Sequence, residues 1–182
     1  MSRNEYEYEY GAETGARGPV RGTGAGRDVA RDALARRIAT VVAATFLLVG
    51  ILEFIPGVTQ DLDQIEFAGH ESGAELLGIF QVSILHNIVH LLFGVVGLAL
   101  ARRADTARAF LIGGGVVYLL LTVYGLAIDQ DGDANFIPVN DADNWLHLGL
   151  GIGMVALGLL VLPRRHRDVD RPGGVRPGQA PT

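Results

Sequence analysis

The sequence contains no cysteine and no lysine, and it has one tryptophan and two methionines. The absence of cysteine excludes disulfide bonds, thiolate metal sites and covalently attached haem, although it does not identify a redox compartment. All 15 basic residues are therefore arginines. Together with the abundant alanine, glycine and valine, this bias indicates a bacterial protein from a GC-rich genome.

Polar residues are scarce over most of the chain and gather at its ends and in short interruptions. Hydrophobic residues make up 49% of the 182 residues, a length that suits one domain. A soluble domain distributes its polar residues along amphipathic elements, whereas this segregation is typical of an integral membrane protein.

The two ends lack the composition needed for a hydrophobic core. Residues 1–27 combine a Glu-Tyr alternation with a Gly- and Arg-rich run, and residues 164–182 are rich in Arg, Pro and Gly. Such segments bury too little apolar surface to offset the entropy lost on ordering. The sequence therefore predicts disordered tails on both sides of a membrane domain at residues 28–163.

Four apolar runs occupy this domain. A hydrocarbon core of about 30 Å requires roughly 20 helical residues at a rise of about 1.5 Å per residue. The runs, each of suitable length, cover residues 38–57, 80–101, 108–128 and 144–162. We therefore expect an all-α fold, an integral membrane four-helix bundle.

The charges between the runs predict the orientation in the membrane. Arginines precede the first run, surround the turn between the second and third, and follow the fourth: Arg27, Arg31, Arg36, Arg37, Arg102, Arg103, Arg108, Arg164, Arg165 and Arg167. The other two loops contain no arginine and carry the acidic residues Asp61, Asp63, Glu66, Glu71, Glu75, Asp129, Asp131, Asp133, Asp141 and Asp143. Basic residues mark the cytoplasmic side. We expect a multi-pass protein of the bacterial cytoplasmic (inner) membrane, with both termini inside and both acidic loops outside.

One pattern, Asn-x-x-His-Leu-x-x-Gly, occurs twice within the apolar runs, at residues 87–94 and 144–151. The two runs that carry it cross the membrane in the same direction. The simplest arrangement is two helical hairpins related by a pseudo-twofold axis along the membrane normal. Polar and ionisable residues are costly inside a bilayer, so the repeat marks a candidate functional site.

The repeated Asn and His share one helical face because they are three positions apart. His86 lies on the same stripe as His90, and Glu53 reaches a similar depth from the first run. Gln81 and Asp143 lie near the outer mouth. The sequence thus predicts one polar cluster in the outer half of the bilayer, formed by Glu53, His86, Asn87, His90, Asn144 and His147.

Three interpretations of this cluster remain open. The side chains can hydrogen-bond between helices and fix their register, in a non-catalytic protein without a cofactor. They can bind a metal ion through His86, His90 and His147, with Glu53 as a further ligand. They can also hold a b-type haem between His90 and His147, although a small bundle must open considerably to admit a porphyrin.

Catalysis and transport are less supported. No Ser or Cys nucleophile accompanies the histidines at a suggestive spacing, with Ser83 the nearest hydroxyl. The inner halves of the second and fourth runs are wholly apolar, which argues against a conduit for ions. The expected partners are the lipid bilayer and either a second copy or another membrane protein. Nucleic acid is not expected, because topology explains the arginine clusters.

Several blocks of the sequence resemble a bacterial, largely actinobacterial, membrane-protein family described as the domain of unknown function numbered 4383. These blocks are residues 54–57, 67–70, 80–97, 109–113 and 143–147. The resemblance covers residues 38–162 and implies four membrane spans with no assigned activity. The family pattern is expected to place a small residue, usually glycine, before Phe-Ile-Pro-Gly, so Glu53 would be particular to this protein.

Overall fold

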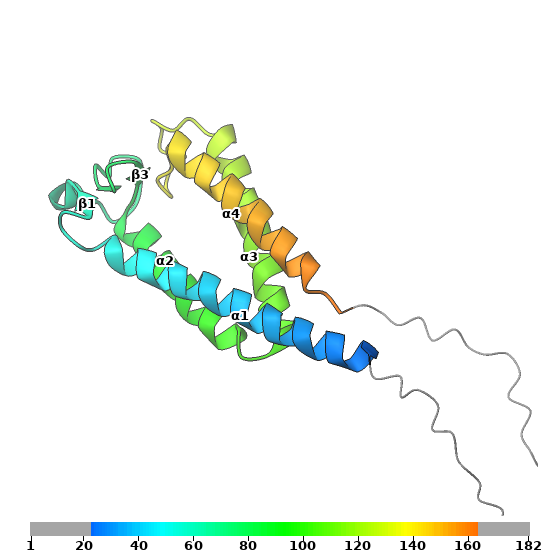
Figure 1. Cartoon of the computed structure of the whole chain (residues 1–182). Helices are drawn as coiled ribbons and strands as arrows, with labels where there is room; N and C mark the ends of the chain where they lie inside the picture. Colours follow the sequence, from blue (N-terminus) through cyan, green and yellow to red (C-terminus); the bar gives the residue numbers. More distant parts are fainter. Residues whose placement is uncertain (1–22, 164–182) are drawn as a thin grey trace, which may run out of the picture.

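The computed structural model describes residues 23–163, which are mostly helical. The four helices are α1 (Thr23–Leu52), α2 (Ile84–Leu100), α3 (Ala104–Ala127) and α4 (Asp141–Leu160). Helix α1 packs against α2, and α3 packs against α4 (Figure 1). The start of α1 and the end of α4 lie at one end of the molecule, which we call the tail end. Residues 53–83 and 128–140 lie at the other, the loop end (Figure 1).

Within the described residues, three helices are long and apolar enough to cross a membrane: Gly26–Leu52, Ala104–Ala127 and Asp141–Leu160. Helix α2 is apolar but has 17 residues, at the short end of the range of about 17–25 residues for a span. These helices confirm the expectation of a mainly helical fold and are compatible with a membrane helical bundle.

The helix ends differ from the predicted runs for local reasons. Helix α1 begins at Thr23, inside the predicted tail, and ends at Leu52, because Pro56 and the positive φ of Gly57 (88°) turn the chain. Helix α2 begins after Ser83, whose side chain accepts a hydrogen bond from the backbone N–H of His86. The rest of the predicted tails, residues 1–22 and 164–182, lies outside the described residues.

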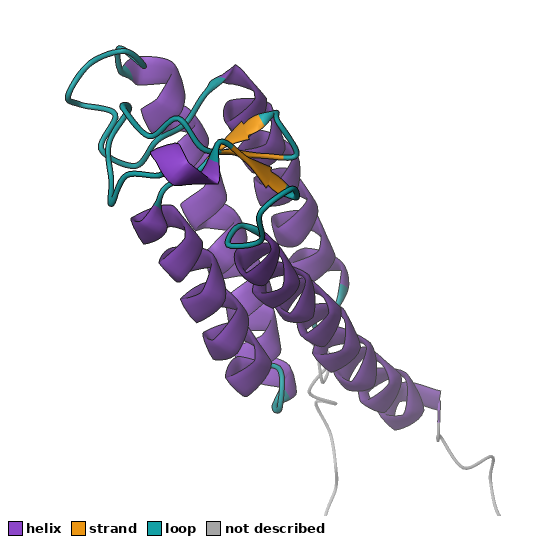
Figure 2. Ribbon diagram, turned by 90° about the vertical axis from the view of Figure 1, so that its left-hand side faces the viewer, coloured by secondary structure: helices purple, strands orange, loops and turns teal. Residues whose placement is uncertain are grey.

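A small sheet at the loop end corrects the all-α prediction. Strands β1 (Thr59–Gln60), β2 (Glu75–Leu76) and β3 (Phe80–Gln81) pair antiparallel in the order β1-β2-β3, with a 3-10 turn, η1, at Leu62–Gln64 (Figure 2). Buried Leu76 and Val82 pack against Val49 and Leu52 of α1. Strands of two residues are too short to show an alternating pattern, so the sequence gives no sign of them.

Small residues bring the helices of each pair close together. A Cβ atom on Gly94 of α2 would lie 2.6 Å from the backbone nitrogen of Leu47 in α1. A Cβ atom on Gly115 of α3 would lie 2.8 Å from the carbonyl oxygen of Gly151 in α4. Many large apolar side chains, such as Leu48 and Leu120, are exposed on the outer faces. This distribution of small residues inside and large residues outside suits helices surrounded by lipid.

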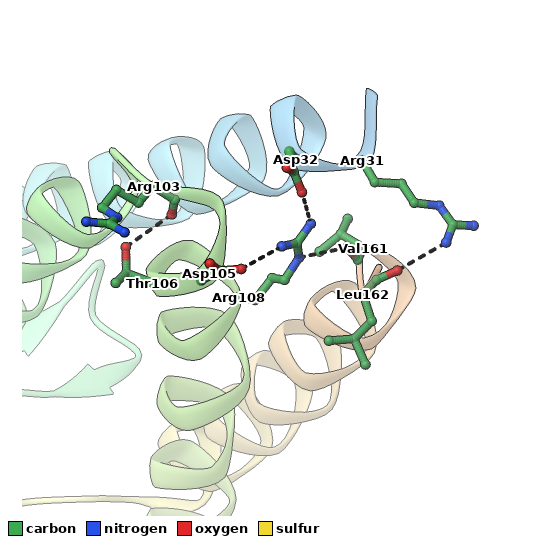
Figure 3. A network of polar contacts seen from close by, with 8 residues as sticks. All are labelled: Arg31, Asp32, Arg103, Asp105, Thr106, Arg108, Val161 and Leu162. Atoms are coloured by element: carbon green, nitrogen blue, oxygen red, sulfur yellow. Dashed lines mark hydrogen bonds and ion pairs between the residues drawn. The ribbon is translucent and has the colours of Figure 1, made fainter. Parts of the chain in front are cut away.

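Three helices are joined at the tail end by a buried arginine (Figure 3). Arg108 of α3 is 5% exposed, and its Nε donates to the carbonyl of Val161 at 2.8 Å. Its other nitrogens donate to Asp105, at 3.2 Å, and to Asp32 of α1. The buried charge is therefore paired and hydrogen-bonded, as its desolvation requires. The sequence showed Arg108 only as a marker of topology, because Asp32 is 76 positions away.

Candidate functional site

The residues of the first Asn-x-x-His copy meet the end of α1. Glu53 directly follows α1 and is 1% exposed. Its Oε1 lies 2.6 Å from Nδ1 of His90, and its backbone carbonyl accepts a hydrogen bond from Nδ2 of Asn87 at 3.3 Å. The ring centroid of His86 lies 4.5 Å from that of His90 and 6.2 Å from that of His147. Glu53 and the three histidines therefore form one cluster.

The second copy packs against α3. The buried side chain of Asn144 fills the space where a Cβ atom of Gly125 would lie. The ring of His147 lies 5.2 Å from that of the buried Tyr118, measured between centroids. Asn144 makes no side-chain hydrogen bond to the other cluster residues in the described part of the chain. The observed contacts thus join five of the six predicted residues, while the side chain of Asn144 packs against Gly125.

A cavity of about 380 Å³ lies between α1 and α4. We call it the α1–α4 cleft. Its apolar walls come from both helices and include Val42, Phe46, Leu150, Met154 and Leu157. Its polar end is lined by Glu53, His86, His90, Asp143 and His147, beside Tyr118. The cleft is thus apolar along most of its length and polar at the loop end.

The loop end of the cleft is closed, and its opening lies along the helices. Leu76, Phe80 and Val82 cover the loop end. The Oδ2 of Asp143 accepts hydrogen bonds from the backbone N–H of Gln81 at 3.1 Å and of Asn140 at 3.0 Å, which ties β3 to α4. On the rim, by contrast, Val41 is 65% and Leu146 42% exposed. The cleft therefore opens on the apolar outer faces of α1 and α4.

Several buried polar atoms in the described residues have no hydrogen-bond partner. They are Glu53 Oε2, His86 Nδ1, Asn87 Oδ1, His147 Nδ1 and both amide atoms of Asn144. Glu53, His86 and His147 also line the cleft. A buried polar atom without a partner costs about 1–3 kcal/mol, so each such atom requires an explanation. For the three residues that line the cleft, a ligand in the cleft provides one.

The three histidines have no preformed metal geometry. Among residues 23–163, no group of three or more His, Cys, Asp or Glu residues is arranged to hold a metal ion. In addition, Nδ1 of His90 is already engaged by Glu53. A metal held by His86, His90 and His147 would require these side chains to rearrange. A haem held between His90 and His147 stays a prediction.

Other residues of the cleft were not foreseen. Phe46 and Tyr118 stack at a centroid distance of 5.3 Å beside the histidines. Gly149 and Gly153 line the cleft from α4, and a Cβ atom on either would meet nothing within 4 Å. The spacing of these glycines at i and i+4, on one face of the fourth run, is the signal that could have indicated an open groove.

Comparison with known proteins supports the family but adds no relative of known structure. No curated protein and no solved structure is similar to the chain. A family model, "Domain of unknown function (DUF4383)", matches residues 36–160. This match contains both Asn-x-x-His copies, Glu53 and all of the residues that line the cleft. With most of its length matched, the chain belongs to the DUF4383 family.

Proposed function

We propose that this protein is a non-catalytic membrane protein that binds an amphiphilic lipid in the α1–α4 cleft. The observation that carries the proposal is an apolar cleft, open along two helices, that ends at a buried and partly unpaired polar cluster. Ligand sites typically measure about 300–1,000 Å³ and combine apolar walls with a few polar groups. A cavity of about 380 Å³ with this lining meets that description.

The expected topology gives the cleft the polarity of a lipid in the outer leaflet. In this proposal, four spans cross the bacterial cytoplasmic membrane, with both termini inside and the acidic loops outside. The polar end of the cleft then lies toward the outer surface. The cleft follows α1 from Val41 to Glu53, about 18 Å at about 1.5 Å per residue. Half of a hydrocarbon core of about 30 Å is about 15 Å, so the cleft matches the depth of one leaflet.

Two related hairpins form the scaffold of the proposed site. Gly94 of the first copy packs on Leu47 of α1, and Gly151 of the second copy packs on Leu119 of α3. Each copy therefore contacts the helix that precedes it in the chain. This correspondence supports a pseudo-twofold relation between α1–α2 and α3–α4, with the cleft between the first helix of one pair and the last of the other.

A binding role fits the side chains better than a catalytic one. The residues that line the cleft include no Ser or Cys, and the hydroxyl of Thr45 is already donated to the carbonyl of Val41 at 3.0 Å. Among the residues that line the cleft, no serine, cysteine or free threonine hydroxyl is therefore paired with the histidines as a nucleophile. The bilayer supplies the ligand in this proposal, and assembly with a second copy or another membrane protein remains compatible with it.

Two glycine substitutions test the cleft. A Cβ atom on Gly153, in the cleft, or on Gly113, on the exposed face of α3, would meet nothing within 4 Å. Gly153→Leu should fill the cleft without disturbing the protein, and Gly113→Leu is its matched control. The probe is a long-chain alcohol with a photoreactive diazirine in its tail, incorporated into proteoliposomes of neutral phospholipid.

Labelled peptides are then mapped by mass spectrometry. We expect labelling of residues 41–49 and 150–157 in the natural protein and in Gly113→Leu, and loss of this labelling in Gly153→Leu. Thermal unfolding in detergent should show both variants folded. Labelling spread evenly over the lipid-facing residues of α2 and α3, or unchanged by Gly153→Leu, would refute the proposal.

The metal and haem alternatives are tested on purified protein. We expect a folded, colourless preparation without stoichiometric metal, measured by absorption spectroscopy and elemental analysis. A Soret band, or one metal ion per chain that is lost in His147→Leu, would favour the alternative in which the histidines hold a cofactor.

A further inference from the structure

We infer that the bound lipid has an uncharged hydroxyl head, which donates a hydrogen bond to Glu53 and accepts one from a histidine of the cluster. This inference rests on the proposed binding of a lipid in the α1–α4 cleft. It follows from three properties of the polar end: an unused acceptor, unused imidazole nitrogens, and the absence of an arginine among the residues that line the cleft.

The unused acceptor is Oε2 of Glu53. The other carboxyl oxygen, Oε1, lies 2.6 Å from Nδ1 of His90. The side-chain amide of Asn87 donates a hydrogen bond to the backbone carbonyl of Glu53. One proton lies between Oε1 and Nδ1, on either atom. As long as this is the only proton shared by the pair, Oε2 carries none and is an acceptor. Because Oε2 has no partner within the described residues and belongs to a residue that lines the cleft, a ligand head that reaches it supplies the missing donor.

The unused nitrogens are Nδ1 of His86 and Nδ1 of His147. A neutral imidazole has one N–H donor and one acceptor nitrogen. His86 already hydrogen-bonds to the backbone of Pro138, so its Nδ1 is an acceptor, whereas His147 can carry its N–H on Nδ1 and present it to the cleft. The ligand head must then accept a hydrogen bond as well as donate one. A hydroxyl group does both with a single oxygen atom, whereas an ether oxygen only accepts and a quaternary ammonium does neither.

Charge excludes acidic heads. Glu53 and Asp143 both line the polar end, and no arginine lines the cleft, while the sequence contains no lysine. A phosphate or carboxylate head would lie beside these acidic groups in a low-dielectric site, without a cation to compensate it. An uncharged alcohol avoids this repulsion and satisfies both kinds of unpaired atom.

Three photoreactive probes with identical diazirine tails test the head group: a primary alcohol, its methyl ether and the corresponding carboxylic acid. Each is incorporated separately, at the same molar ratio, into proteoliposomes of neutral phospholipid. A buried acceptor that loses its donor weakens binding by about tenfold or more. We therefore expect the alcohol to label residues 41–49 and 150–157 about tenfold more than the ether or the acid does.

The outcomes separate the inference from the proposed function. Equal or stronger labelling of the cleft by the acid or the ether would overturn the hydroxyl head and keep lipid binding. Failure of all three probes to label the cleft above the outer faces would overturn lipid binding itself.

A variant of Glu53 sharpens the result. Glu53→Gln keeps the shape of the side chain but places an NH₂ donor at the carboxyl. The preference for alcohol over ether should therefore fall toward equality, while Gly113→Leu keeps it. An unchanged preference in folded Glu53→Gln would show that Glu53 does not accept from the ligand. The probe series on the natural protein decides the inference even if this variant fails to fold.

Discussion

The two copies of Asn-x-x-His-Leu-x-x-Gly pack alike but pair differently. In both, the final glycine contacts the preceding helix. In the first copy, Asn87 and His90 bond to Glu53, whereas in the second, Asn144 and Nδ1 of His147 have no partner among residues 23–163. The residue that follows α1 is Glu53, and the residue that follows α3 is Ile128, which offers no side-chain partner. The shared role of the repeat is therefore helix packing. Its Asn and His side chains differ in their hydrogen bonding between the two hairpins.

The largest difference in stability between the two copies is expected for His90→Leu and His147→Leu. His90→Leu leaves the carboxyl group of Glu53 buried without its partner, and breaking a buried pair costs about 3–5 kcal/mol. His147→Leu removes a nitrogen that has no partner, so it should leave stability unchanged or raised. The measurement is the free energy of unfolding in mixed detergent micelles.

A second substitution checks the cause of this contrast. Glu53→Leu in the His90→Leu background should restore much of the lost stability, because no unpaired carboxyl group remains. Equal losses in His90→Leu and His147→Leu would show that the two copies do not differ in pairing.

A smaller difference in the free energy of unfolding is expected between alanine substitutions at the two motif glycines, Gly94 and Gly151. A methyl group on Gly94 would meet the backbone of Leu47, which cannot move without shifting α1. On Gly151 its two nearest neighbours are side-chain atoms of Leu119 at 2.8 Å, which can rotate away, and the backbone carbonyl oxygen of Gly115 lies further off at 3.0 Å. Overpacking costs about 1–3 kcal/mol of stability. Alanine has a better helix propensity than glycine, by about 1 kcal/mol, which offsets part of this cost. Gly94→Ala should therefore destabilise the protein more than Gly151→Ala in the same unfolding assay, and the reverse order would contradict the packing described for α1 and α2.

The smallest difference in the free energy of unfolding is expected between Asn87→Leu and Asn144→Leu. Asn87 donates one long hydrogen bond, at 3.3 Å, and such bonds between membrane helices average about 0.6 kcal/mol. Asn144 donates none, so its replacement should not destabilise the fold through a lost bond. Replicate unfolding curves for both variants resolve this difference, and a larger loss for Asn144→Leu would point to a partner for its amide.

The sequence predicted the helices and the family well because long apolar runs and short sequence blocks are local signals. It predicted that Glu53 and His90 share a depth, and the structure places their side chains in contact. It did not predict the cleft, whose walls come from residues near Val41 and Leu157, more than a hundred positions apart. Long-range side-chain pairing, like the contact of Arg108 with Asp32, depends on how the hairpins dock, which no local pattern encodes. The roles of the cluster residues remain predictions.

The position of the cleft rim on helix faces has a consequence for how occupancy should be measured. Val41, Thr45 and Leu146 border the opening, so a ligand that enters there arrives by lateral diffusion within the bilayer. Its effective concentration is then its mole fraction among the lipids. Diluting a suspension of loaded proteoliposomes with buffer should leave the cleft filled. Fusing the same vesicles with an excess of ligand-free phospholipid should empty it.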